Sequence, residues 1–166
     1  CNGWCYPWTI PMLNGKTICL RNIDVKKIFE LIDKYNVTHF GGAPIILNMI
    51  TGAPESDRKK LKQKVHVLTA GAPPPSIIFK KMKSLGFEVM HVYGLTETYG
   101  HVTQCAWNDS WNELEEEKQN EIKARQGVRY PNTEGVTIMD PETMKEVPKD
   151  GKTIGEIMIR GNVVMK

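Results

Sequence analysis

The feature that most constrains the fold is a regular alternation of short apolar segments and amphipathic segments between residues 24 and 93. Predicted strands, rich in β-branched and aromatic residues, cover residues 37–40, 65–69 and 87–93. Predicted helices between and before them cover residues 25–35, 44–50 and 76–85. Strands that alternate with helices at these lengths favour a parallel sheet with right-handed crossover connections.

Capping and turn residues support these boundaries. The first helix has a single apolar stripe, formed by Val25, Ile28, Phe29 and Ile32. Asp24 is a suitable N-cap for this helix, Pro44 is suited to the first turn of the second, and Gly86 to the end of the third. The strand at 87–93 is mostly apolar on both faces, so we expect helices on both sides of it. A further short strand is expected at residues 17–20.

The sequence changes character after Trp111. Residues 112–125 predict a polar helix, and short strands are expected at 135–139 and 154–160. We therefore predict an α/β fold, a largely parallel sheet flanked by helices, followed by the start of a smaller β-rich subdomain. The expected division is residues 1–127 and 128–166, with both parts incomplete. The chain begins without Met and stops in an apolar run, so we expect it to be an internal piece of a longer protein.

Composition narrows the classes of partner. The net charge is only +3 among 166 residues, so charge gives no reason to expect a nucleic acid or an anionic membrane as partner. No apolar run is long enough to span a bilayer. The four cysteines match neither a zinc pattern nor a disulfide framework, so we expect free thiols in a reducing compartment. The oligomeric state is left open.

Two loops are candidates for chemistry, because ligands of parallel α/β sheets collect beyond the carboxyl ends of the strands. One is Ala70–Pro73 and the other is Tyr93–Thr98. In the second loop, Gly94 removes a side chain just after a predicted strand, and the threonine hydroxyls suit phosphate oxygens. A carboxylate at Glu97 is compatible with phosphates if Mg²⁺ bridges the two. The loop therefore has the chemistry of a nucleotide–metal site.

A second interpretation of the same loop stays open. Thr96-Glu97-Thr98 after a strand also fits a helix N-cap with an acidic residue in its first turn. Taken by itself, the stretch fits a capped helix start better than a nucleotide site.

Four segments together resemble the adenylate-forming superfamily, which includes acyl-CoA synthetases, luciferases and peptide-synthetase adenylation domains. Tyr93–Glu97 is similar to its Y-G-x-T-E motif, and Gly71–Pro73 to its G-A-P loop. Cys1–Trp4 is similar to the tail of its aromatic acid-pocket motif, and Gly155–Gly161 to its G-E-[IL]-x-[IV]-[RK]-G strand. The segments occur in the family's order, and the resemblance covers nearly the whole chain.

The resemblance is closest to medium-chain and plant-type acyl-activating enzymes. In that group the Y-G-L-T-E-T-Y-G stretch runs into C-A-W, as at Cys105–Trp107, and a later A-R-Q-G matches Ala124–Gly127. The implied enzyme is an AMP-forming acid–CoA ligase. It would form acyl-AMP from a carboxylic acid and Mg-ATP, and would then transfer the acyl group to coenzyme A.

The resemblance also implies residue roles on the nucleotide side. Gly71, Ala72 and Pro73 would line the ribose and adenine. Tyr93 would stack on adenine, and His91 lies where the family places a contact to the adenine edge, often through an amide residue.

Catalytic roles fall to Thr96, which would bind the α-phosphate, and to Glu97, which would hold Mg²⁺. The border of the acid pocket would be formed by Trp4, Ala43, Ala70, Gly94 and Gly100.

Two elements that the family needs are absent from this sequence: a Gly/Ser/Thr-rich phosphate loop, and the lysine of a C-terminal domain. We therefore expect the isolated 166 residues to show no turnover. The alternatives are another adenylate-forming enzyme, with a luciferin-type reaction or a carrier-protein acceptor, and a non-catalytic nucleotide-binding module. The expected location is the cytoplasm, with the peroxisome as the alternative in a eukaryote.

Overall fold

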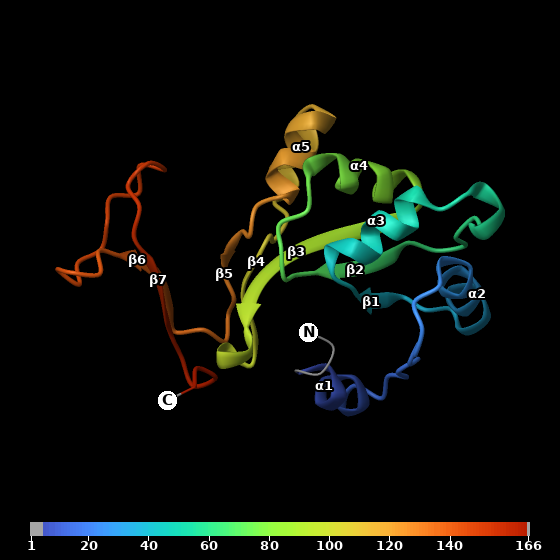
Figure 1. Ribbon diagram of the computed structural model, residues 1–166, viewed down its shortest axis with the longest axis horizontal. Coiled ribbons are helices and arrows are strands. Elements are labelled where there is room, and N and C mark those ends of the chain that lie inside the picture. The colour runs from blue at the N-terminus through green and yellow to red at the C-terminus, as the bar shows by residue number, and fades with distance from the viewer. Residues whose placement is uncertain (1–4, 166) are drawn as a thin grey trace.

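A mixed five-stranded sheet forms the centre of the computed structural model, which describes residues 5–165 (Figure 1). The strand order follows the sequence: β1 (His39–Gly41), β2 (Val65–Thr69), β3 (Phe87–Leu95), β4 (Gly100–Gln104) and β5 (Val128–Arg129). β1, β2 and β3 pair in parallel, whereas β4 and β5 are antiparallel to their neighbours. The predicted α/β class and largely parallel core are confirmed, and the antiparallel half makes the sheet mixed.

The crossover helices are those that the apolar periodicity predicted. They are α2 (Val25–Tyr35), α3 (Pro44–Gly52) and α4 (Ser76–Ser84). The Asp24 side chain accepts the Lys27 N–H at 2.9 Å, and Asn36 ends α2 in the left-handed conformation. Gly86 follows α4 with φ 92°, which explains the glycine there.

The core lies between these three helices and one face of the parallel strands. Alternate residues of β2 and β3, among them Val65, Val67 and Val89, are buried against α2, α3 and α4. Phe87 is the aromatic centre of the core. The centroid of its ring lies 5.8 Å from that of Phe29 in α2 and 5.9 Å from that of Phe40 in β1. The helices are thus fixed to the sheet by burial of apolar surface.

The opposite face of the parallel strands is open among the described residues, which corrects the expectation of helices on both sides. Met90 is 38% exposed, and the rings of His39 and His66 are stacked on the exposed surface with their centroids 4.9 Å apart. Within Phe87–His91, buried residues alternate with more exposed ones, which is the pattern of a strand that is covered on one face only.

The segment after β4 forms a short 3-10 helix, η3 (Asp109–Glu113), and then α5 (Glu116–Lys123). The polar helix expected at 112–125 is therefore shorter than predicted. The Cys105 thiol donates to the Ile122 carbonyl at 3.2 Å, and Lys123 forms an ion pair with Glu88 of β3. The ion pair holds α5 to β3, the Cys105 hydrogen bond holds it to the segment after β4, and α5 also packs against α4.

A separate two-stranded antiparallel sheet follows, formed by β6 (Gly135–Met139) and β7 (Glu156–Arg160). It lies to one side of the main sheet (Figure 1). The expected strands are confirmed, although the second begins two residues later than predicted. β5 belongs to the five-stranded sheet, and the division after residue 127 stays a prediction.

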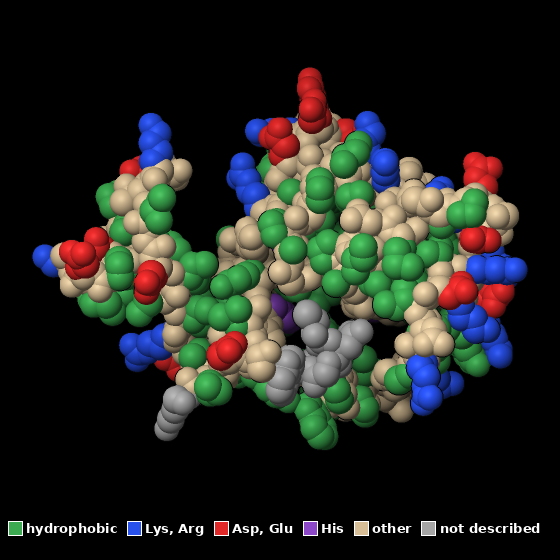
Figure 2. Space-filling view, viewed as in Figure 1, with side chains coloured by type: hydrophobic (Ala, Val, Ile, Leu, Met, Phe, Trp, Pro, Cys, Tyr) green, Lys and Arg blue, Asp and Glu red, His purple; other side chains and the backbone are tan. Residues whose placement is uncertain are grey.

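The amino-terminal part contains α1 (Tyr6–Met12), and α3 is followed by a 3-10 turn, η1 (Glu55–Asp57). The strand predicted at residues 17–20 is wrong, because this segment is irregular and pairs with no other described strand. Within residues 5–165, we find no helix with the length and apolar character needed to cross a bilayer. Figure 2 shows basic and acidic side chains interspersed around the visible face.

We expect Phe87→Ala to lower the free energy of unfolding by about 3–5 kcal/mol, because it leaves a cavity where three aromatic rings meet. Urea unfolding followed by circular dichroism measures this. Trp8→Ala is the control, since Trp8 is 68% exposed and its loss is expected to change stability by about 0.5 kcal/mol or less. Equal effects of the two substitutions would contradict this account of the core.

Candidate functional site

The Tyr93–Thr98 stretch spans the end of a strand and the turn after it. Tyr93, Gly94 and Leu95 are the last residues of β3 and pair with β4, rather than forming a loop. The turn is a 3-10 helix, η2 (Thr96–Thr98), followed by Tyr99 in the left-handed conformation. The chain then returns as β4, so the motif lies at the tip of a β-hairpin.

Thr98 holds this tip together. Its hydroxyl is buried, accepts the Leu95 N–H at 2.9 Å, and lies 2.8 Å from the Gly100 carbonyl and 3.0 Å from the Leu95 carbonyl, to which it can donate. Tyr99 N–H donates to the Thr96 carbonyl at 3.1 Å. Thr98 thus stabilises the three-residue turn from its third position, whereas the N-cap, which the second interpretation assigned to the Thr-Glu-Thr stretch, is Leu95.

Thr96 and Glu97 are left available. Both side chains are exposed and form no hydrogen bond or ion pair with another described residue. A free hydroxyl next to a free carboxylate can bind a phosphate oxygen and a hard divalent cation, since Mg²⁺ prefers carboxylate and phosphate oxygens. Across residues 5–165 no group of three or more His, Cys, Asp or Glu side chains could hold a metal by itself. A metal at Glu97 would therefore take its remaining ligands from a bound phosphate, water or residues elsewhere.

The other predicted loops follow the carboxyl ends of neighbouring parallel strands. Ala70–Pro73 connects β2 to α4, and Ala43 is the N-cap of α3 after β1. Gly71 has φ 98° and, with Ala72 and Pro73, is exposed. Because the three strands are parallel, these loops and the end of β3 belong to the same edge of the sheet.

His91 and Tyr93 lie on the same face of β3 as the core residues. His91 is 2% exposed, and its Nδ1 is 2.8 Å from the Ala124 carbonyl, which can only accept. Nδ1 is therefore protonated, and the ring is fixed against the end of α5. Thr69, its partner in the register with β2, has a buried hydroxyl without a hydrogen-bond partner among the described residues. Tyr93, one pleat further along, is half-buried.

The two glycines of the predicted acid pocket approach other parts of the protein. A Cβ on Gly94 would lie 1.9 Å from the Gly100 carbonyl oxygen and 2.5 Å from the His101 Cα. A Cβ on Gly100 would lie 2.9 Å from the Cys5 sulfur. Gly94 thus allows the close pairing of β3 and β4, and Gly100 leaves room for the segment before α1. Trp4 lies outside the described residues.

Polar aromatic residues surround this side of the hairpin. The His101 ring packs edge-on against Tyr130, with centroids 4.2 Å apart. Burial lowers the pKa of His101, so its imidazole is held neutral more strongly than a free one. Burial also raises the pKa of Tyr6, with smaller contributions from Cys5 and Tyr130. No local signal in the sequence assigns these residues to the site, because they are brought together only by the fold.

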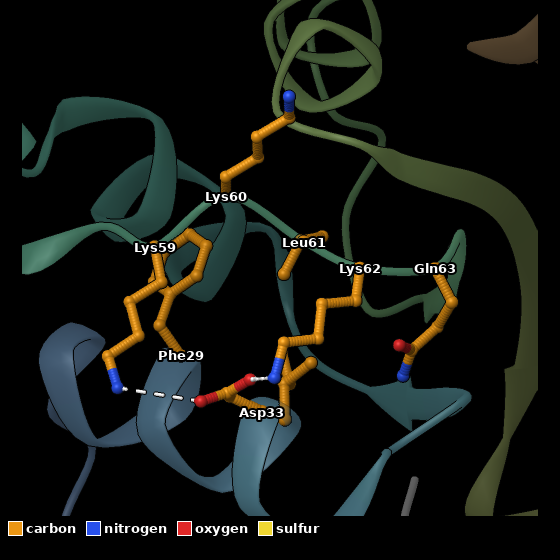
Figure 3. A pocket seen from close by; sticks show the side chains of 8 residues that line it. Phe29, Asp33, Lys59, Lys60, Leu61, Lys62 and Gln63 are labelled. Carbon is orange, nitrogen blue, oxygen red and sulfur yellow. Dashed lines mark ion pairs between the residues drawn. The ribbon is translucent and has the colours of Figure 1, made fainter.

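A pocket in the described structure lies elsewhere, between α2 and residues 59–63 (Figure 3). Its lining includes Phe29 and Leu61, and Asp33 forms ion pairs there with Lys62 at 2.5 Å and Lys59 at 3.7 Å. The hydrogen bond and charge of Lys62, with a smaller contribution from Lys59, hold the pKa of Asp33 below its usual range. Its only acidic side chain, Asp33, is thus paired, and none of the predicted site residues lines the pocket.

Comparison with known proteins gives close relatives over the full chain. The profile of the family described as AMP-binding enzyme matches residues 1–166. The peroxisomal acetate/butyrate–CoA ligase AAE7 of Arabidopsis thaliana is 52% identical over 168 residues, covering 100% of this chain and 29% of that protein. The acetate–CoA ligase CCL3 of Humulus lupulus is also 52% identical, with the same coverage. The chain thus spans 29% of the length of these relatives.

Solved structures share the fold of this chain. The N-terminal domain of FACL13 from Mycobacterium tuberculosis superimposes with a TM-score of 0.70 at 24% sequence identity, over 93% of this chain and 36% of that one. At this identity the similarity establishes the fold alone.

We expect Gly94→Ala to open the β3–β4 hairpin, because the added methyl group would overlap the backbone of the facing strand. The free energy of unfolding should fall by about 1–3 kcal/mol, as for overpacked sites, and the amide protons near Leu95 should exchange faster. Chemical unfolding and hydrogen exchange measure the two effects. Gly52→Ala is the control, since the added Cβ has no atom within 4 Å apart from its chain neighbours and the backbone of its own helix. A neutral Gly94→Ala would contradict the close approach.

Proposed function

Because the chain belongs to the AMP-binding enzyme family, we propose that it forms the nucleotide- and acid-binding part of an AMP-forming acid–CoA ligase. The observation that carries this proposal is the 52% identity to CoA ligases over the whole chain. The exposed Thr96 and Glu97 at the hairpin tip supply suitable side chains. The substrates would be a carboxylic acid, ATP and coenzyme A.

In the first half-reaction, a carboxylate oxygen of the acid attacks the α-phosphorus of ATP, and the bond to pyrophosphate breaks. Thr96 would donate its hydroxyl to an α-phosphate oxygen, and Glu97 would hold Mg²⁺, which neutralises phosphate charge. The contribution of these residues is positioning and charge neutralisation rather than covalent chemistry. In the second half-reaction, the CoA thiolate attacks the acyl carbon and AMP leaves.

The nucleotide would lie along the carboxyl edge of the parallel strands. Gly71, Ala72 and Pro73 would line the ribose and adenine, with Tyr93 stacked on the base. The exposure of the first three residues supports their part of the arrangement. His91 would contact the adenine edge through Nε2, because Nδ1 is already committed to Ala124.

The acid would bind next to the nucleotide, at the same edge of the sheet. Its pocket would be bordered by Trp4, Ala43, Ala70, Gly94 and Gly100. A short-chain acid is the proposed substrate, since the two relatives above are described as ligases of acetate and butyrate or of acetate. We propose a cytoplasmic or a peroxisomal location, and the peroxisomal description of AAE7 supports the second.

We expect Glu97→Ala to reduce acid-dependent ATP–pyrophosphate exchange by about 10²-fold or more in the full-length protein, as for other lost electrostatic contacts in catalysis. Exchange is measured as a function of Mg²⁺ concentration. Because Glu97 is exposed, thermal stability should stay close to that of the parent. Glu117→Ala, an exposed glutamate on α5, is the control and should leave exchange unchanged. Near-normal acyl-AMP formation by Glu97→Ala would rule out the metal role.

We expect residues 1–166 alone to give no acid-dependent exchange above a blank, because the phosphate loop and catalytic lysine of the family are not among them. The same assay applied to the chain and to the full-length protein checks this. Addition of CoA to the full-length protein should release acyl-CoA and AMP. Exchange without CoA-dependent AMP release would instead favour another adenylate-forming enzyme.

A further inference from the structure

Two strained residues far apart in the sequence touch each other beside the motif. Cys5 and Tyr99 are non-glycine residues with positive φ, at 63° and 53°. The Cys5 thiol lies 3.0 Å from the Tyr99 carbonyl oxygen and donates to it. Such conformations cost free energy and persist only where the surrounding structure imposes them, often at functional sites.

The fold keeps Cys5 in a state suited to donation. Burial raises the pKa of the thiol, so the sulfur stays protonated. The sulfur lies so close to Gly100 that a Cβ there would come within 2.9 Å of it. Any larger residue at position 100 would displace the thiol from the Tyr99 carbonyl. Gly100 and Cys5 therefore depend on each other for this contact.

A second contact holds the same turn from another side. The Met165 N–H, five residues after the end of β7, donates to the Glu97 carbonyl at 2.7 Å. The turn is thus held at the carbonyl of Glu97 by the segment that follows the small sheet. It is held at the carbonyl of Tyr99 by the segment that precedes α1.

These contacts set the place of the Glu97 carboxylate. Its side chain bonds to no other described residue, so the direction in which it leaves the turn depends on the backbone of the turn. Thr98 fixes the turn internally, whereas Cys5 and Met165 fix it relative to α1 and to the small sheet.

We propose that Cys5 and the backbone of Met165 form a two-sided clamp that positions Glu97 for its cation. Both are positioning residues, and neither contacts the substrate in this proposal. The inference rests on the proposed role of Glu97. It adds that the segments flanking α1 and β7 control the metal affinity of the turn.

The first test compares Cys5→Ala, which loses the donor, with Cys5→Ser, which keeps one. In the full-length protein, Cys5→Ala should raise the Mg²⁺ concentration for half-maximal exchange by roughly 3- to 10-fold, the range for one lost hydrogen bond. Cys5→Ser should recover most of this loss. Cys19→Ala is the control, because Cys19 is an exposed free cysteine in the irregular segment before α2.

The second test removes the other half of the clamp. Met165→Pro deletes the N–H, whereas Met165→Ala keeps it. Hydrogen exchange of the Leu95 and Tyr99 amides should be faster in Met165→Pro and Cys5→Ala than in Met165→Ala and Cys5→Ser. This readout needs no enzymatic activity.

The outcomes separate the clamp from the proposed function. An inactive parent would overturn the proposed function and with it the cation role of Glu97, and the amide exchange rates would then show only whether Cys5 and Met165 hold the turn. A shift in Mg²⁺ requirement that Cys5→Ser reverses supports the clamp. Loss of thermal stability with an unchanged Mg²⁺ requirement would overturn it, because that result indicates packing alone. Unchanged amide exchange in both Met165→Pro and Cys5→Ala would also overturn it.

Discussion

The parallel register of β1, β2 and β3 is the constraint on which the other features of the structure depend. It is stabilised by burial of alternate apolar residues, with Phe87 at the centre, beneath helices that the crossover connections must supply. The same register brings the carboxyl ends of three strands to one edge of the sheet. Ala43, the Ala70–Pro73 loop and the end of β3 share an edge for this reason, although they are far apart in the sequence.

The hairpin tip after β3 contains one side chain that is bonded within the turn and two that are not. Thr98 closes the turn with its hydroxyl, as a capping residue does, and this leaves Thr96 and Glu97 free to meet a ligand. Thr98 is therefore structural, whereas the ligand roles of Thr96 and Glu97 are a proposal that their exposure supports.

The sequence predicted the elements best where local signals were strong. Helix α2 has an apolar stripe and an N-cap, and it forms as expected. The strand predicted at 17–20 lacked any such support and is absent, because an isolated apolar tetrapeptide forms a strand only when a partner strand is available. The expectation that helices cover both faces of β3 came from its apolar composition. In the structure, Glu88 and Met90 alternate with buried residues, so only one face of this part of the strand is covered.

The sequence by itself determined the alternation of strands and helices, the motif chemistry and the family, because these depend on neighbouring residues. Only the tertiary structure decided that Cys5 donates to Tyr99, that Met165 donates to Glu97 and that His91 is fixed by Ala124. Each of these contacts joins residues more than 30 positions apart, and all three end on a backbone carbonyl, a group that every residue has. Local propensity carries no information about such pairs, since their geometry arises only when the sheet and its hairpin have formed.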